Sequence, residues 1–188
     1  MRRLVLAVAL ALAPLASATT IVRLAFDELA HASQVIVHGT VTRVEVVAVG
    51  GDERRLRTQV DIAVAETLAG APRQLLRLDL VGGRRGKWAL TIPGMPSFTP
   101  GEEVVLFLED LGPRPPSTAP RYALTGLGQA KFTVTTSGGV RRVTRSLGGA
   151  HLVSRPGSPD VHRSETPEAP ETLDELLGAV RALKGGHQ

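Results

Sequence analysis

Histidine is the residue that most often supplies acid–base catalysis or a metal ligand near neutral pH, and this chain contains five of them. They are His31, His38, His151, His162 and His187. No two of them stand four residues apart around a Glu, as a helical zinc-protease site requires. His38 is the one inside an expected strand. The sequence places no acid–base partner beside it, so we interpret it as a solvated or hydrogen-bonded strand residue.

The segment Gly82-Gly83-Arg84-Arg85-Gly86-Lys87 is the nearest approach to a phosphate-binding loop. Its glycine spacing does not fit that motif, and Trp88 stands where a Ser or Thr would hold magnesium. We therefore expect a flexible basic loop. Its backbone amides, together with Arg84, Arg85 and Lys87, are able to bind an anion.

Four acidic residues flank one expected strand: Glu102, Glu103, Glu109 and Asp110. Neighbouring residues on a strand point to opposite faces, so adjacent acids cannot act together on one glycosidic bond. We interpret them as charges that keep the strand ends soluble. The chain also has no Gly-x-Ser-x-Gly nucleophile elbow and no Asp-rich calcium loop. The sequence thus predicts no catalytic residue, no metal site and no cofactor.

Composition limits the partners further. Cysteine is absent, which excludes disulfides, thiolate zinc sites, thiol catalysis and a lipoprotein-type lipid anchor. The formal net charge of +4 is too small an excess to indicate a nucleic-acid partner. Aromatic residues make up only 3% of the chain, so core packing is expected to use most of those that could stack on bases.

The N-terminus has the pattern of a secretory signal peptide over residues 1–18. A basic start, Met1-Arg2-Arg3, precedes an apolar run from Leu4 to Leu15, and Ala16-Ser17-Ala18 supplies the small residues of a cleavage site. Cleavage after Ala18 removes Arg2 and Arg3, which lowers the net charge from +4 to +2. We expect an exported protein, periplasmic or extracellular, with no transmembrane anchor after cleavage. The alternative is an uncleaved N-terminal anchor.

Residues 34–66 predict two long β-strands joined by a polar, glycine-led turn at residues 50–55. In the first strand the apolar positions change face near Thr42-Arg43, which indicates a β-bulge. A short helix is expected over Phe26 to Ser33, because acids occupy its first turn.

Further strands are expected at residues 76–80, 102–108, 122–124, 131–135 and 140–143, with residues 102–108 central because they are apolar on both faces. Residues 81–101 are expected to be irregular. Residues 19–147 then form the β domain, and residues 148–170 have the composition of a linker.

A C-terminal amphipathic helix is predicted over residues 171–185, since Thr172 and Glu175 have the spacing of a capping box. So short a helix is marginal alone, and we expect it to dock on the β domain. The alternative is a tail helix that docks on another protein.

The run Phe26-Asp27-Glu28-Leu29-Ala30, the strand Val35-Ile36-Val37-His38-Gly39-Thr40-Val41 and the segment Gly101 to Leu108 carry a resemblance. The pattern covers about residues 24–135. It resembles exported bacterial proteins of unknown function and, more distantly, the netrin-like OB barrel of tissue inhibitors of metalloproteinases. Those inhibitors chelate zinc through an N-terminal Cys, which is absent here, so the resemblance implies only the barrel.

Together these observations predict a mainly β fold: a five- to six-stranded OB-like barrel with a short N-terminal helix and a C-terminal helix. OB barrels bind through loops and one sheet face. The leading hypothesis is an exported non-catalytic binding or protein-interaction module, whose partner is an extracytoplasmic protein or polysaccharide. The predicted contact residues are Arg84, Arg85, Trp88 and Phe98. The alternatives are a secreted hydrolase with a loop-borne site using His38 or His151, and a structural envelope component.

Overall fold

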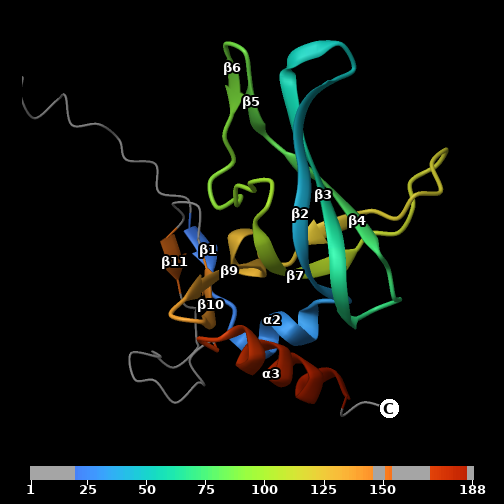
Figure 1. Ribbon diagram of the computed structural model, residues 1–188. Coiled ribbons are helices and arrows are strands. Elements are labelled where there is room, and N and C mark those ends of the chain that lie inside the picture. Colours follow the sequence, from blue (N-terminus) through green and yellow to red (C-terminus); the bar gives the residue numbers. More distant parts are fainter. Residues whose placement is uncertain (1–19, 146–150, 154–169, 186–188) are drawn as a thin grey trace, which may run out of the picture.

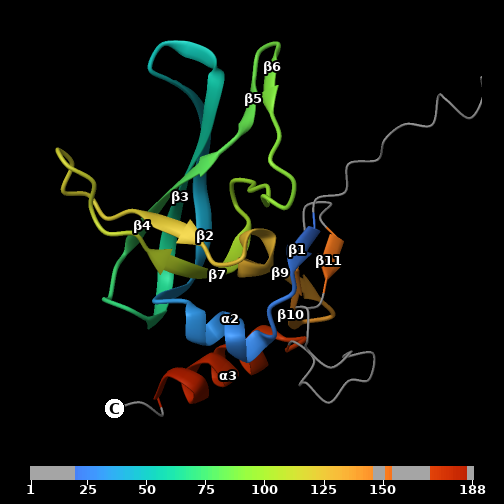
Figure 2. The same cartoon turned by 180° about the vertical axis from the view of Figure 1, so that it is seen from behind.

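The computed structural model describes residues 20–145, 151–153 and 170–185 (Figures 1 and 2). Within them the fold is mainly β, with one seven-stranded antiparallel sheet, two two-stranded sheets and two α-helices. This confirms the mainly β part of the prediction and its two helices. The predicted signal peptide, residues 1–18, lies outside the described residues.

Two long strands, β2 (Val35–Val49) and β3 (Asp52–Ala69), form the hairpin that the sequence predicts. Gly50 and Gly51 make the turn with φ of 65° and 76°, a conformation in which a side chain would be strained. The register of the two strands shifts between Val41 and Arg43, where the change of apolar face predicted a bulge. The hairpin continues well beyond the rest of the sheet (Figure 1).

The central strand is β7 (Glu103–Asp110), in which every residue from Val104 to Leu108 is buried. It pairs with the first half of β2 on one side. On its other side its N-terminal half pairs with β9 (Lys131–Ser137) and its C-terminal half with β8 (Tyr122–Leu124). The sheet then extends to β10 (Val140–Arg145) beyond β9 and to β4 (Leu75–Val81) beyond β3.

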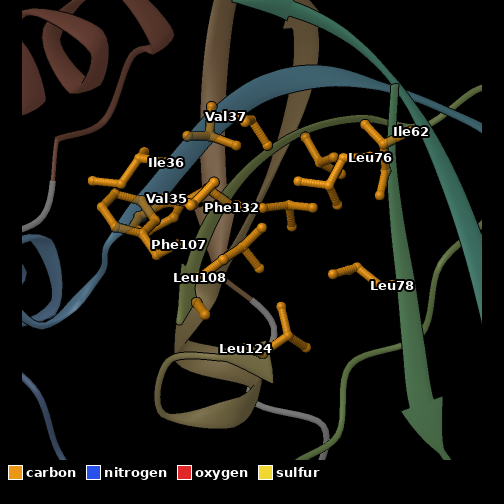
Figure 3. Packing of buried hydrophobic residues seen from close by; sticks show 14 of the residues in the cluster. Val35, Ile36, Val37, Ile62, Leu76, Leu78, Phe107, Leu108, Leu124 and Phe132 are labelled. Carbon is orange, nitrogen blue, oxygen red and sulfur yellow. The ribbon is translucent and has the colours of Figure 1, made fainter. Parts of the chain in front are cut away.

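One continuous cluster of buried apolar side chains covers both faces of the middle of the sheet. Val35, Val60, Leu78 and Leu106, which come from four different strands, all belong to it. Figure 3 shows part of this cluster, with Val35 and Ile36 of β2 near Phe107 and with Ile62 of β3 near Leu76 of β4. The ring centroids of Phe107 and Phe132 are 5.4 Å apart. The apolar alternation of the strands therefore predicts the interior correctly.

Two helices lie side by side below the sheet (Figures 1 and 2). They are α2 (Phe26–Ala32) and α3 (Leu173–Gly185). The capping box before α3 is formed, since the Glu175 amide donates to Thr172 Oγ1 and Thr172 N donates to Glu175 Oε2. Leu173, Leu176, Leu177 and Val180 are buried in the common core. The helix thus docks on its own domain, and the tail-helix alternative is wrong.

Four features differ from the sequence-based expectations. Residues 81–101 contain a small hairpin, β5 (Gly83–Arg85) and β6 (Trp88–Leu90), and a 3-10 turn, η1 (Leu127–Ala130), precedes β9. Within the expected linker, β11 (His151–Val153) pairs in parallel with β1 (Thr20–Val22). Strands β4 and β8 are not paired with each other, so the described strands do not form a closed barrel.

Candidate functional site

The two hairpins β2–β3 and β5–β6 project together from the end of the molecule that lies opposite the helices (Figures 1 and 2). The smaller hairpin is fixed to the larger at its base, where Gly82 N donates to Leu56 O at 2.9 Å and Thr58 Oγ1 donates to Gly82 O at 2.8 Å. Gly83 has φ of 132°, and a Cβ there would lie 2.7 Å from Thr58 Oγ1. Glycine is therefore required for this close approach.

Trp88 lies half-buried between the two hairpins. The guanidinium carbon of Arg54, from β3, is 5.2 Å from the centre of its ring, and Lys87 Nζ is 5.3 Å from it. Both distances are within the range of cation–π attraction. Trp88 thus joins the tip of one hairpin to the tip of the other.

We call the exposed end of the two hairpins the basic tip. It comprises five cations and two acids: Arg54, Arg55, Arg84, Arg85 and Lys87 with Asp52 and Glu53, and all seven are exposed. Five positive and two negative charges leave an excess of three. Its one ion pair is loose, with Arg85 Nη1 at 3.7 Å from Glu53 Oε1. The excess charge is therefore presented to solvent.

Phe98 does not belong to the basic tip. It is 8% exposed in the core, and Lys131 Nζ lies 4.6 Å from the centre of its ring. A groove of about 330 Å³ beneath the β5–β6 hairpin is lined by Arg84 and, elsewhere, by Phe98. Of the four predicted contact residues, Arg84 and Arg85 belong to the basic tip and Trp88 lies beside it, whereas Phe98 lies in the wall of the groove, which Arg84 also lines. The sequence did not indicate Arg54, because its contact with Trp88 spans two hairpins.

His38 is hydrogen-bonded, as its strand position suggested. Its Nε2 lies 2.7 Å from Glu103 Oε1, and Arg141 Nη1 is 3.8 Å from the same oxygen. The His38 ring is largely buried. This is the histidine–carboxylate half of a catalytic arrangement, but among the described residues no hydroxyl side chain bonds to His38. The other candidate histidine, His151, stands at the start of β11.

Glu102 has a separate set of partners from its neighbour Glu103. Its Oε1 accepts from Lys131 Nζ at 2.5 Å and from Thr133 Oγ1 at 2.8 Å, and Lys131 also donates to Ser97 O at 2.6 Å. Burial alone would raise the pKa of Glu102. Hydrogen bonds from Lys131 and Thr133 and the charge of Lys131 outweigh burial and hold that pKa below its ordinary value. The ion pair between Glu102 and Lys131 therefore links β9 to the loop that precedes β7.

Within residues 20–145, 151–153 and 170–185, no three His, Asp or Glu side chains are grouped so that they could hold a metal ion. Neither helix in the same residues is long and apolar enough to cross a membrane. No family model, curated protein or solved structure matches this chain.

Proposed function

We propose that this protein is an exported, non-catalytic binding module that holds an anionic partner, an extracytoplasmic protein or polysaccharide, at the basic tip. The observation that carries the proposal is the contact of Arg54 and Lys87 with the Trp88 ring, which holds two projecting hairpins together, with exposed Arg84 and Arg85 on the neighbouring strand β5. Excess like charge at one end of a protein steers and retains a partner of opposite charge.

The frame of the module is an OB-like barrel with one open side. The neighbour order β8-β7-β2-β3-β4 supports this, as does the position of β8, which runs in the same direction as β4 on the far side of the sheet. Such frames bind through loops and hairpins that project from them.

The test compares two double variants of the chain that begins at Thr19. In the tip variant, Arg84→Ser is combined with Arg85→Ser. In the control variant, two other exposed arginines are replaced, by Arg43→Ser and Arg114→Ser. Both variants lose two positive charges, so a difference between them reports position rather than net charge.

Binding to polygalacturonate, an acidic polysaccharide, and to polyglutamate, an acidic polypeptide, is measured by calorimetry at two salt concentrations. We expect the tip variant to bind about tenfold more weakly than the control to at least one polymer, with the gap closing at high salt. Equal weakening by both variants, or no binding of the original chain, rejects the tip. Recovery of the chain beginning at Thr19 outside the cytoplasm tests export.

A hydrolase is the second candidate, because His38 and Glu103 form a hydrogen-bonded pair. Turnover by the mature chain that His38→Ala abolishes would favour it over the binding module. Retained turnover in that variant would exclude His38 from any hydrolytic role.

A further inference from the structure

A second surface lies on the open side of the sheet, between β4 and β8. It is a cleft of about 870 Å³, which we call the β4–β8 cleft. Leu76, Leu80, Met95, Leu124 and Leu127 contribute apolar walls. A cleft of this size and character is large enough to receive several side chains of a ligand.

The hydrogen bonds at the two ends of β4 establish which of its backbone groups are unpaired. Gly82 N donates to Leu56 O, and Val64 N donates to Gln74 O, each at 2.9 Å. Hydrogen-bonded pairs alternate along an antiparallel ladder, so the even-numbered residues of β4 bond to β3. The odd-numbered residues then direct N–H and C=O away from β3, at the free edge of β4: Leu75, Arg77, Asp79 and Val81. One of these groups is occupied, because the Asp79 carbonyl oxygen accepts from Arg57 Nη2 at 2.7 Å.

The same reasoning applies to β8. Leu111 N donates to Arg121 O at 2.9 Å and Thr125 N donates to Phe107 O at 3.1 Å, so residues 121, 123 and 125 bond to β7. The N–H and C=O groups of Tyr122 and Leu124 therefore lie at the edge of β8 that faces away from β7. No backbone hydrogen bond joins β4 to β8 in the described part of the chain. Both strands therefore border the cleft with unpaired backbone groups.

The charge around the cleft is mainly positive. Four arginines and one acid line it: Arg57, Arg73, Arg77, Arg121 and Asp79. Arg57 bonds to Asp79 at 2.7 Å and Arg77 to Asp61 at 2.5 Å. Arg73 instead bonds to Tyr122 Oη and to Ala71 O, and Arg121 has no ion pair with any described residue. Two positive charges are thus left for a ligand to neutralise.

We propose that the β4–β8 cleft binds an extended, acidic segment of a partner polypeptide, which adds as a strand to the free edge of β4. An added strand would satisfy the unpaired N–H groups of Arg77, Asp79 and Val81 and the carbonyl groups of Arg77 and Val81. Alternate side chains of that strand point to opposite faces. One set would then enter the apolar cleft towards Met95 and Leu124, while the other set, where acidic, would lie near Arg121. The segment is therefore one in which apolar and acidic residues alternate over about seven positions, matching the length of β4.

This inference does not depend on the basic tip, which is formed by other strands at the projecting end of the molecule. The probe is a seven-residue peptide of alternating valine and glutamate with blocked ends. Amide hydrogen exchange, read residue by residue by NMR, is measured with and without the peptide. We expect protection at the amides of Arg77, Asp79 and Val81, which are the donors that a new strand would use.

Two variants and one modified peptide test the mechanism. Val81→Pro removes an edge N–H without removing a bond to β3, and Val81→Ala is its control. Arg121→Glu reverses the unpaired charge, with Arg114→Glu as a control of equal charge. We expect Val81→Pro and alternate N-methylation of the peptide each to abolish protection, and Arg121→Glu to weaken binding about tenfold relative to Arg114→Glu. The N-methylated peptide keeps the test valid if Val81→Pro fails to fold.

Four results would overturn the proposal. One is no protection at these three amides at any peptide concentration. Another is equal binding of a valine–lysine peptide, which would remove the charge argument. A third result concerns two variants. If the double variant Arg84→Ser with Arg85→Ser no longer bound the peptide and Arg121→Glu bound it normally, the peptide would lie at the basic tip. The last is protection of the β4 amides from hydrogen exchange that increases with protein concentration in the absence of peptide. The occupant of the cleft would then be a second copy of this chain.

Discussion

The backbone of Gly39 in β2 lies so close to Ala63 in β3 that a Cβ on Gly39 would be 2.3 Å from the Ala63 carbonyl oxygen. The same atom would lie 3.0 Å from Val64 Cα, so backbone surrounds it as well as side chains. The register of the two strands breaks between His38 and Gly39, directly beside this contact. A side chain at position 39 would thus force apart the hairpin that supports both proposed binding surfaces.

Gly39→Ala is expected to lower the free energy of unfolding by about 3 kcal/mol, because the strands must separate to admit the methyl group. Urea denaturation followed by circular dichroism measures the change. The control is Gly178→Ala in α3, where nothing lies within 4 Å of the new atom. It is expected to raise stability by about 0.5–1 kcal/mol through helix propensity. Equal stability of the Gly39 variant and the original chain would contradict the close contact.

Glu102→Gln should destabilise the fold by about 3 kcal/mol, because it leaves the buried ammonium of Lys131 without its counter-charge. Thr133→Val, which removes one neutral donor to the same carboxylate, should cost about 1 kcal/mol. Denaturation at neutral pH compares the two variants. A smaller loss for Glu102→Gln than for Thr133→Val would contradict the ion pair.

The ion pair between Glu102 and Lys131 should also make the stability of the fold depend on pH. The pKa of Glu102 is lowered in the folded protein relative to its ordinary value of 4.5. The unfolded chain therefore takes up the proton first as the pH falls. The contribution of Glu102 to stability is fully present above pH 4.5 and is lost as the pH falls through the lowered value. Stability curves of the original chain and Glu102→Gln should converge in acid, and parallel curves would contradict this assignment.

Leu176→Ala should destabilise the domain by about 3 kcal/mol, because Leu176 is wholly buried where α3 meets the core. Asp174→Ala, two residues away on the exposed side, removes a surface ion pair with Arg141 and one of the two acids in the first turn of α3, and should change stability by less than about 1 kcal/mol. Thermal unfolding of the two variants makes the comparison. Similar melting temperatures would mean that α3 contributes no burial to the fold.

The local pattern of the sequence was sufficient for much of the sheet. The change of apolar face at Thr42-Arg43 predicted the bulge because side chains alternate strictly along a strand, and the observed register shift lies there. The apolar character of both faces predicts that residues 102–108 form a central strand, and the five residues from Val104 to Leu108 are all buried. Each of these features is encoded within a few consecutive residues.

The features that the sequence did not predict depend on contacts between segments that are far apart in the chain. The β5–β6 hairpin lies in a Gly- and Pro-rich stretch, where alternation is too short to be read, and its position depends on Gly83 packing against Val46 and Thr58. The open side of the sheet depends on whether β4 and β8, some forty residues apart, come close enough to pair. The periodicity of apolar residues does not encode the distance between β4 and β8. The cleft between them and the arginines that line it were therefore found only in the structure.

The chain contains one tryptophan and one tyrosine, and the fold assigns them to different surfaces. Trp88 stands at the junction of the two hairpins, whereas Tyr122 lines the opening between β4 and β8 beneath the Arg73 guanidinium, 4.9 Å from its ring centre. Each surface consequently carries its own native chromophore. Indole emission will follow events at the hairpins and the ring-proton NMR signals of the single tyrosine those at the open side, so occupancy of the two can be recorded separately and without labels.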